Sequence, residues 1–517
     1  MHTNPYTQEK ALNGAKHYLM GRGAAGIAGF ISIILLVRYM DVHNYAAYTA
    51  LTGLAALCCV LASLGIERVI SRYVPEGRLY HSVAELSRFI WLTSAIRLLA
   101  GLIVTLVLYA LWPTVDGFLA VYEFKIFSIA LACFIVAEVM FQHFSSVLQA
   151  LVMQKTLTRL LIIQWSGRLI LIAAVVAMKS VISWEDALWI FAIPEMLGII
   201  GFIVVIKRHL LGLSDPAYSG AAGENWPNWE KATEVGLHNY GFTLLAAPPQ
   251  GYFMKLLTAV YLPVEIVAAY GFFISVAEKT RQYIPLHFFY GLLEPMIIAS
   301  YLKDRDFFLL SQRCQLLYKS NLLLLVPAIA WVAVAGDPIV DVMTGGKFQG
   351  LSWILILVMV QLTIGSHVVL LQLILNSLEK SKLLITASMV ALPVLLLAMA
   401  VAINTSPIWL LSAPILFSLA MNLYIVFQLA IADHPYKPSW KMLGGVTLSG
   451  LAAFLIVGML GVAIPLHGTP VTTAIVALLG VVTVYGLLIW LSEIISKSEV
   501  ELIKNIFLNI RLSKAGT

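Results

Sequence analysis

Long apolar runs recur along the whole chain and constrain its fold more than any other feature. Fourteen of them reach the roughly 20 helical residues needed to cross the hydrocarbon core of a bilayer. They cover residues 19–39, 45–66, 89–111, 126–150, 160–178, 187–206, 235–262, 266–297, 316–335, 351–375, 383–403, 408–431, 442–464 and 471–495. Within a bilayer, a helix satisfies all its backbone hydrogen bonds internally. The sequence therefore predicts an all-α polytopic membrane protein with about 14 transmembrane helices.

The Lys and Arg residues alternate with these runs. Of the 33, 24 lie in the N-terminal tail, in every second connection or in the C-terminal tail. The alternate connections and their borders hold Arg38, Lys125, Lys179, Lys255 and Lys347. By the positive-inside rule, both termini are predicted to be cytoplasmic. The net charge of +6 is then a topology signal and a contact with membrane lipids, and no nucleic-acid partner is expected.

A polar connection at residues 207–234 divides the spans into two sets of six and a final pair. The segment 39–48 aligns without gaps with 261–270 and shares five identities, and both segments follow the first span of their set. Two parallel halves are predicted, which in transporters bind substrate between them near the midplane. The predicted parts are an N-terminal bundle (1–206), a cytoplasmic linker (207–234), a C-terminal bundle (235–431), an extra helix pair (432–496) and an amphipathic interfacial tail (497–517).

Residues 35–77 resemble the opening of the polysaccharide flippases. That family is Wzx-like, of the polysaccharide-transport type, and belongs to the multidrug/oligosaccharidyl-lipid/polysaccharide exporter superfamily. The matching residues are Arg38, Tyr45, Tyr48, Leu64-Gly65 and the run Arg72-Tyr73-Val74-Pro75-Glu76. The Gly that usually precedes the aromatic residue of the second span is missing here, and the final helix pair is a second departure from the usual plan.

The resemblance implies a function and a place in the cell. It implies export of an oligosaccharide linked to undecaprenyl pyrophosphate, from the inner to the outer leaflet of the bacterial inner membrane, by alternating access. A polysaccharide polymerase of the same pathway is the implied protein partner.

Four basic residues lie well inside spans: Arg97, Arg168, Lys279 and Arg281. A charge at that depth costs a few kcal/mol or more and faces a hydrated cavity or a partner. Arg97 and Arg168 lie about eight residues from the cytoplasmic ends of their spans, so they can line one chamber together with Arg22. Arg offers forked, permanently charged donors to a pyrophosphate. Arg22, Arg97, Arg168 and Arg281 are thus the predicted substrate ligands. In the alternative interpretation, either of the buried acids Glu138 and Glu195 simply neutralises one Arg.

The seventh and eighth spans carry the remaining candidates. Pro248 and Pro249 should break the seventh span, and they mark a predicted hinge. Glu278 and Arg281 are three residues apart and can pair on one helical face. Glu278 and Glu138 are candidates for coupling transport to H⁺ or Na⁺, although a permanent Glu278–Arg281 pair would explain the same residues. No cofactor is expected, because nucleotide-loop and metal-site spacings are missing.

Three functions compete at this stage. A flippase needs a cationic chamber, whereas a multidrug exporter of the same architecture usually carries organic cations and favours an acidic one. A membrane polysaccharide polymerase or ligase needs a sizeable outer loop, but the outer connections here do not exceed about 20 residues. The sequence therefore favours a transporter over an enzyme.

Overall fold

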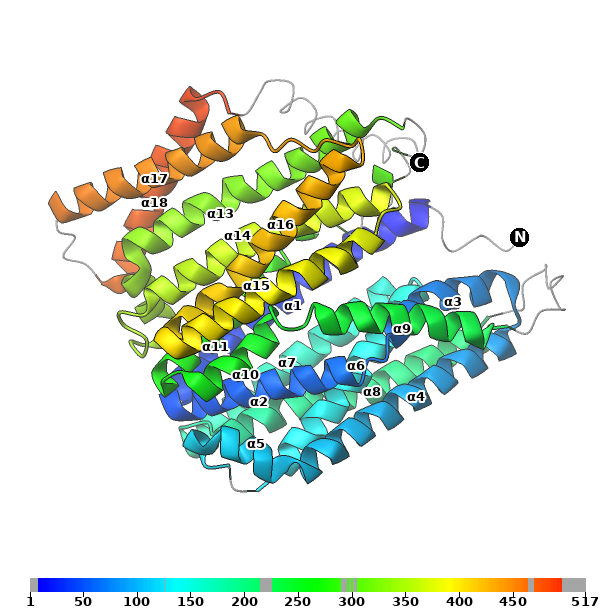
Figure 1. The fold of residues 1–517 in the computed structure, drawn as a ribbon. Helices are drawn as coiled ribbons and strands as arrows, with labels where there is room; N and C mark the ends of the chain where they lie inside the picture. Colours follow the sequence, from blue (N-terminus) through cyan, green and yellow to red (C-terminus); the bar gives the residue numbers. More distant parts are fainter. Residues whose placement is uncertain are drawn as a thin grey trace. The chain divides into compact units, whose positions relative to one another are not determined.

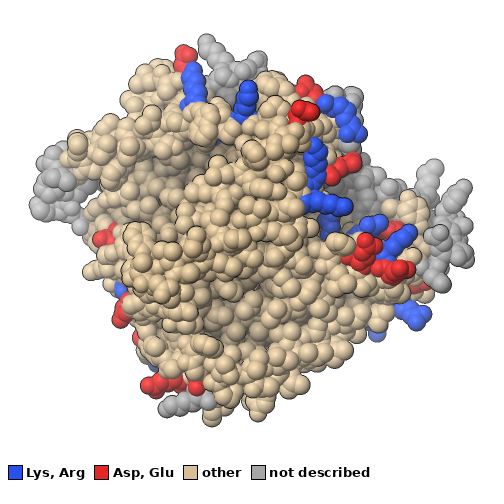
Figure 2. Space-filling view, in the orientation of Figure 1, with Lys and Arg blue, Asp and Glu red and all other residues tan. Residues whose placement is uncertain are grey.

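A computed structural model describes residues 8–124, 126–213, 226–288, 305–463 and 469–494, with positions 290, 294, 297, 298 and 301, and gives side chains from residue 23 onward. Every regular element in these residues is an α-helix or a 3₁₀-helix. Figure 2 shows one face, on which charged side chains lie near the margins and uncharged residues cover the broad area between. That distribution suits a surface in contact with lipid, where charges are costly. The predicted all-α membrane class is confirmed.

Eleven helices in the described residues are long and apolar enough to cross a membrane. The first, seventh and eighth predicted spans are not among them. The first span is counted only over Gly23–Tyr39, the seventh is split into two short helices, and the eighth contains four charged residues in its described part. The number fourteen therefore stays a prediction.

The chain divides into two compact units. Unit 1 comprises residues 1–279 and 402–410. Its α-helices, labelled in Figure 1, are α1 (Gln8–Tyr39), α2 (Val42–Leu61), α3 (Ile66–Tyr80), α4 (Val83–Ala110), α5 (Trp112–Phe118), α6 (Ile129–Ala150), α7 (Gln154–Lys179), α8 (Trp184–Leu211), α9 (Trp229–Leu245), α10 (Gly251–Tyr261) and most of α11 (Val264–Arg281). The 3₁₀-helix η1 (Ala120–Tyr122) lies between α5 and α6 in the chain.

Local sequence determines where two of the long helices begin. Before α4, the Ser82 hydroxyl accepts a hydrogen bond from Glu85 N, and the Glu85 carboxylate accepts one from Ser82 N. Ser183 and Asp186 form the same reciprocal arrangement before α8. Each box satisfies two backbone donors that a helix start would leave unpaired. The short connections before α4 and α8 thereby turn the chain sharply, and each produces an antiparallel helical hairpin.

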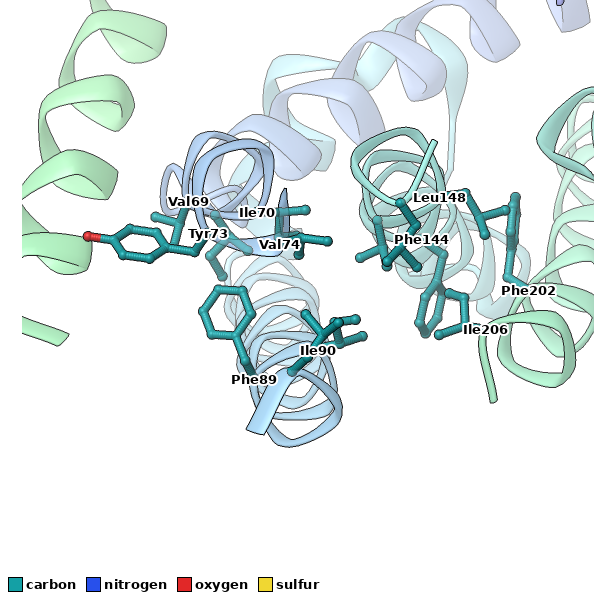
Figure 3. Close-up of a cluster of buried hydrophobic side chains, with 14 of the residues drawn as sticks. Val69, Ile70, Tyr73, Val74, Phe89, Ile90, Phe144, Leu148, Phe202 and Ile206 are labelled. Atoms are coloured by element: carbon teal, nitrogen blue, oxygen red, sulfur yellow. The ribbon is translucent and has the colours of Figure 1, made fainter. Parts of the chain in front are cut away.

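Helix α3 contains the whole family-like run Arg72–Glu76 and was not among the predicted spans. Its apolar residues recur at three- and four-residue intervals, and Ile66, Ile70, Tyr73 and Val74 are buried. They pack in a cluster with residues of α4, α6 and α8, which Figure 3 shows. This period of 3.6 residues is present in the sequence and predicts a helix there.

The seventh span is interrupted where Pro248 and Pro249 lie. Helix α9 ends at Leu245 and α10 begins at Gly251. Both helices belong to unit 1, and α9 crosses the turn before α3 at Gly65, which has a φ of +70°. A Cβ atom on Gly65 would lie 1.9 Å from Gly236 O, so only Gly permits this crossing. Unit 1 thus extends into α11, and the division at residues 207–234 stays a prediction.

Unit 2 comprises residues 280–401 and 411–517. Its described helices are α13 (Phe307–Thr344), most of α15 (Lys382–Thr405), α14 (Ser352–Ser377), part of the 3₁₀-helix η2 (Pro407–Ser412), α16 (Ala413–Ile431), α17 (Trp440–Ala463) and α18 (Pro470–Leu491). The predicted extra pair, α17 and α18, packs against α13, where Trp331 Nε1 donates a hydrogen bond to Ala474 O at 2.8 Å. The predicted amphipathic tail lies outside the described residues.

Candidate functional site

Arg168 and Glu195 form a buried ion pair between α7 and α8. Arg168 Nη2 donates a hydrogen bond to Glu195 Oε1, and the two residues are 5% and 1% exposed. Along the chain, Arg168 lies as far before the end of α7 as Glu195 lies after the start of α8. An antiparallel hairpin places residues equally far from its turn at the same depth. The alternative interpretation, in which Glu195 neutralises an Arg, therefore holds for Arg168.

Arg97 is also in an ion pair, with an acid that was not among the predicted site residues. Arg97 on α4 is fully buried, and its Nη2 lies 2.9 Å from Glu67 Oε1 on α3. Measured along the chain, Glu67 is almost as far from the end of α3 as Arg97 is from the start of α4. The hairpin register could have identified this pair, but α3 was not predicted as a helix. Arg97 Nε and Nη1 have no hydrogen-bond partner among the described residues.

Aromatic rings surround the Arg168 guanidinium. Its Cζ lies 4.2 Å from the Trp165 ring centroid and 4.4 Å from that of Phe191. Trp165 precedes Arg168 by three residues on α7, so the two side chains share a helical face. Stacking of a cation on a ring stabilises it by roughly 0.5–2 kcal/mol, with the larger values in desolvated sites. The ion pair and the two rings together fix this guanidinium.

Lys279 on α11 reaches the same indole from a distant part of the sequence. Its Nζ lies 4.3 Å from the Trp165 ring centroid, and the residue is half-buried. Within the part of the chain that the structure describes, no carboxylate lies within ion-pair distance of this ammonium. Lys279 was recognised as a cation inside a span but was not among the predicted ligands. Trp165 and Lys279 are too far apart in sequence for spacing to relate them.

Two acids lie near these cations. Glu138 on α6 interacts electrostatically with both Glu195 and Lys279, and it accepts a hydrogen bond from Gln142 Nε2 at 2.8 Å. Glu278 on α11 lies beside Gly251, the first residue of α10, where a Cβ atom would be 2.6 Å from Glu278 Oε1. Glu278 is therefore adjacent to the interruption of the seventh span.

The remaining predicted residues are not brought into this cluster. Arg22 lies on α1, but its side chain is outside the described part of the structure. Arg281 is exposed and belongs to unit 2, and the four ion pairs seen among the described residues do not include Glu278 with Arg281. The described residues also contain no group of three His, Cys, Asp or Glu side chains able to hold a metal ion.

The fold is shared with transporters of known structure. It matches the structure described as "Lipid II flippase MurJ, inward closed conformation" with a TM-score of 0.68 and 13% identity, covering 91% of this chain and 97% of that one. An inward-facing multidrug resistance MATE family transporter of the MOP superfamily matches with a TM-score of 0.53 and 10% identity, covering 86% and 98%. A point mutant of the Vibrio cholerae MATE transporter VcmN matches with a TM-score of 0.52 and 16% identity, covering 82% and 97%.

At the sequence level, no curated protein matches the chain significantly. Residues 11–272, just over half of the chain, match the family model described as "Polysaccharide biosynthesis protein" (Polysacc_synt). The resemblance carried by residues 35–77 is confirmed by this match, which includes them. The chain is a multi-pass membrane protein with a transporter fold, and it belongs to the Polysacc_synt family of polysaccharide biosynthesis proteins.

Proposed function

We propose that this protein is a flippase for an oligosaccharide linked to undecaprenyl pyrophosphate. It moves this substrate from the inner to the outer leaflet of the bacterial inner membrane by alternating access, with both termini in the cytoplasm. Membership in a polysaccharide biosynthesis family supports the glycan, and a fold like that of a lipid II flippase supports the lipid carrier. A polysaccharide polymerase of the same pathway then receives the product.

The observation that carries this proposal is the meeting of Arg168 and Lys279 at Trp165 inside a membrane-embedded unit. The headgroup of the substrate is a diphosphate, and cations in a low-dielectric site bind such a polyanion strongly. Arg168 is already paired with Glu195. Lys279 therefore provides the positive charge that is most available to a phosphate oxygen.

The other cations predicted from the sequence remain candidates for the same headgroup. Arg97 has two guanidinium nitrogens without partners among the described residues. It can therefore donate hydrogen bonds to a second acidic group while its ion pair with Glu67 stays intact. Arg22 and Arg281 retain their predicted roles as additional ligands. The proposal therefore rests first on Lys279, then on Arg97 and Arg168.

The proposed substrate can be tested directly. Purified protein in vesicles should move a fluorescent undecaprenyl-diphosphate oligosaccharide across the bilayer, detected by chemical quenching of the outer leaflet. A matched undecaprenyl oligosaccharide that lacks the diphosphate should not be moved. Accumulation of the organic cation ethidium without movement of the lipid would contradict the proposal and favour multidrug export.

Coupling to an ion is the second part of the proposal. Glu278 lies beside the break between α9 and α10, and Glu138 interacts with Lys279 and Glu195. Binding of H⁺ or Na⁺ at either carboxylate changes the local charge and can bias one conformation. We expect Glu278→Gln or Glu138→Gln to remove the dependence of flipping on pH or Na⁺. Glu123→Gln, in the connection between η1 and α6, is the control. Dependence that survives in both variants would show that neither acid couples transport.

The predicted hinge belongs to the same mechanism. Pro248 and Pro249 occupy the interruption that separates α9 from α10. A break of this kind leaves backbone groups unpaired, and such backbone is tolerated at membrane depth beside protein or water. We propose that α9 and α10 change their mutual angle there during transport.

A further inference from the structure

Helices α1 and α8 pack against Trp165 of α7, in addition to the two cations. Trp165 is 8% exposed on α7, and Phe191 of α8 meets it nearly edge-on, with centroids 6.2 Å apart and an interplanar angle of 89°. On α1, a Cβ atom added to Gly29 would lie 3.3 Å from the indole and 3.4 Å from Lys279 Cε. The indole plane is therefore fixed by packing, independently of the two cations.

The two cations depend on this ring to different degrees. Arg168 is also fixed by its ion pair with Glu195 and by Phe191. Lys279 has a flexible four-carbon stem, and no described carboxylate lies within ion-pair distance of it. The face of an indole attracts an ammonium through its quadrupole and thereby selects one position for it.

We propose that Trp165 is a positioning residue that holds the Lys279 ammonium where it binds the substrate diphosphate. The inference rests on the proposed function, because it assumes that Lys279 is a ligand of that group. A pre-positioned ammonium loses less side-chain entropy on binding than a free one. Trp165 thus strengthens binding of an anion that it does not contact.

The test replaces Trp165 site-specifically with indoles carrying one to four fluorine atoms. Fluorination weakens the ring quadrupole while almost preserving its shape. Binding of farnesyl diphosphate, the probe, is measured by calorimetry in nanodiscs. We expect Kd to rise stepwise, by about threefold to tenfold in total. The same series at Trp91, which contacts Phe144 edge-on, should leave Kd unchanged, and thermal unfolding should show that all variants fold.

The same measurements on a Lys279→Met variant distinguish this inference from the proposed function. The Lys279→Met variant with an ordinary Trp165 should already bind farnesyl diphosphate more weakly than the wild type. Fluorination of Trp165 in that variant should have no further effect. An equal fluorination effect in Lys279→Met, or none in the unmodified background, would overturn the positioning role while leaving Lys279 as a ligand. If Lys279→Met binds the probe normally, Lys279 is not a ligand of the diphosphate and the positioning role is overturned. The proposed function is tested separately, by movement of the diphosphate-linked oligosaccharide in vesicles.

Discussion

Replacement of Arg168 by Ala is expected to destabilise unit 1 by about 3–5 kcal/mol, because it leaves the Glu195 carboxylate buried without its partner. Glu195 is 1% exposed and its Oε2 has no hydrogen-bond partner among the described residues. An ionised carboxylate in that position has little access to water and loses the cation with which it is paired. The measurements are the protein level in membranes and the unfolding temperature in detergent.

A double variant distinguishes the structural role of Arg168 from a role in binding. Arg168→Met with Glu195→Gln removes both charges, so most of the lost stability should return, whereas flipping should stay low if Arg168 contacts the substrate. Lys179→Ala is the matched control. Lys179 pairs with Asp186 beside the turn of the same hairpin but is 57% exposed, and an exposed pair contributes about 1 kcal/mol or less. An Arg168→Ala protein as stable as the wild type would contradict the assignment.

Replacement of Lys279 by Met is expected to remove transport while the protein remains folded. The Met side chain is about as long as that of Lys but is uncharged and apolar. Among the described residues, no carboxylate lies within ion-pair distance of Lys279, so the change leaves no acid unpaired. Loss of a charge-assisted hydrogen bond to a phosphate costs roughly 1.5–3 kcal/mol, which is about a 10-fold to 150-fold weaker Kd. Binding of a polyprenyl diphosphate and flipping in vesicles measure the two effects.

Two further variants make this result specific. Lys279→Arg keeps the positive charge and should retain part of the activity. Lys155→Met removes a cation near the start of α7, away from the Trp165 cluster, and should leave flipping unchanged. Normal flipping by Lys279→Met would show that the ammonium is not a ligand, whatever the other cations do.

The two buried ion pairs show how much of the site the sequence could have predicted. Arg97 and Arg168 were correctly identified as cations inside spans, and Glu195 was named as a buried acid that could neutralise one. Each pair is nearly symmetric about the turn of a helical hairpin, so depth along the two helices could have predicted both partners. For Glu67, this required predicting that Ile66–Tyr80 is a helix, which its apolar period of 3.6 residues supports.

The sequence by itself determined the membrane class, the positions of most helices and the break at Pro248 and Pro249. It could do so because a bilayer requires each span to satisfy its own backbone hydrogen bonds, a condition that a local stretch either meets or fails. Only the tertiary structure placed Lys279 of α11 against Trp165 of α7. In a membrane, small residues and interhelical hydrogen bonds determine which helices pack together, rather than the apolar pattern that identifies the spans. The spacing of residues along the chain therefore could not predict the contact between Lys279 and Trp165.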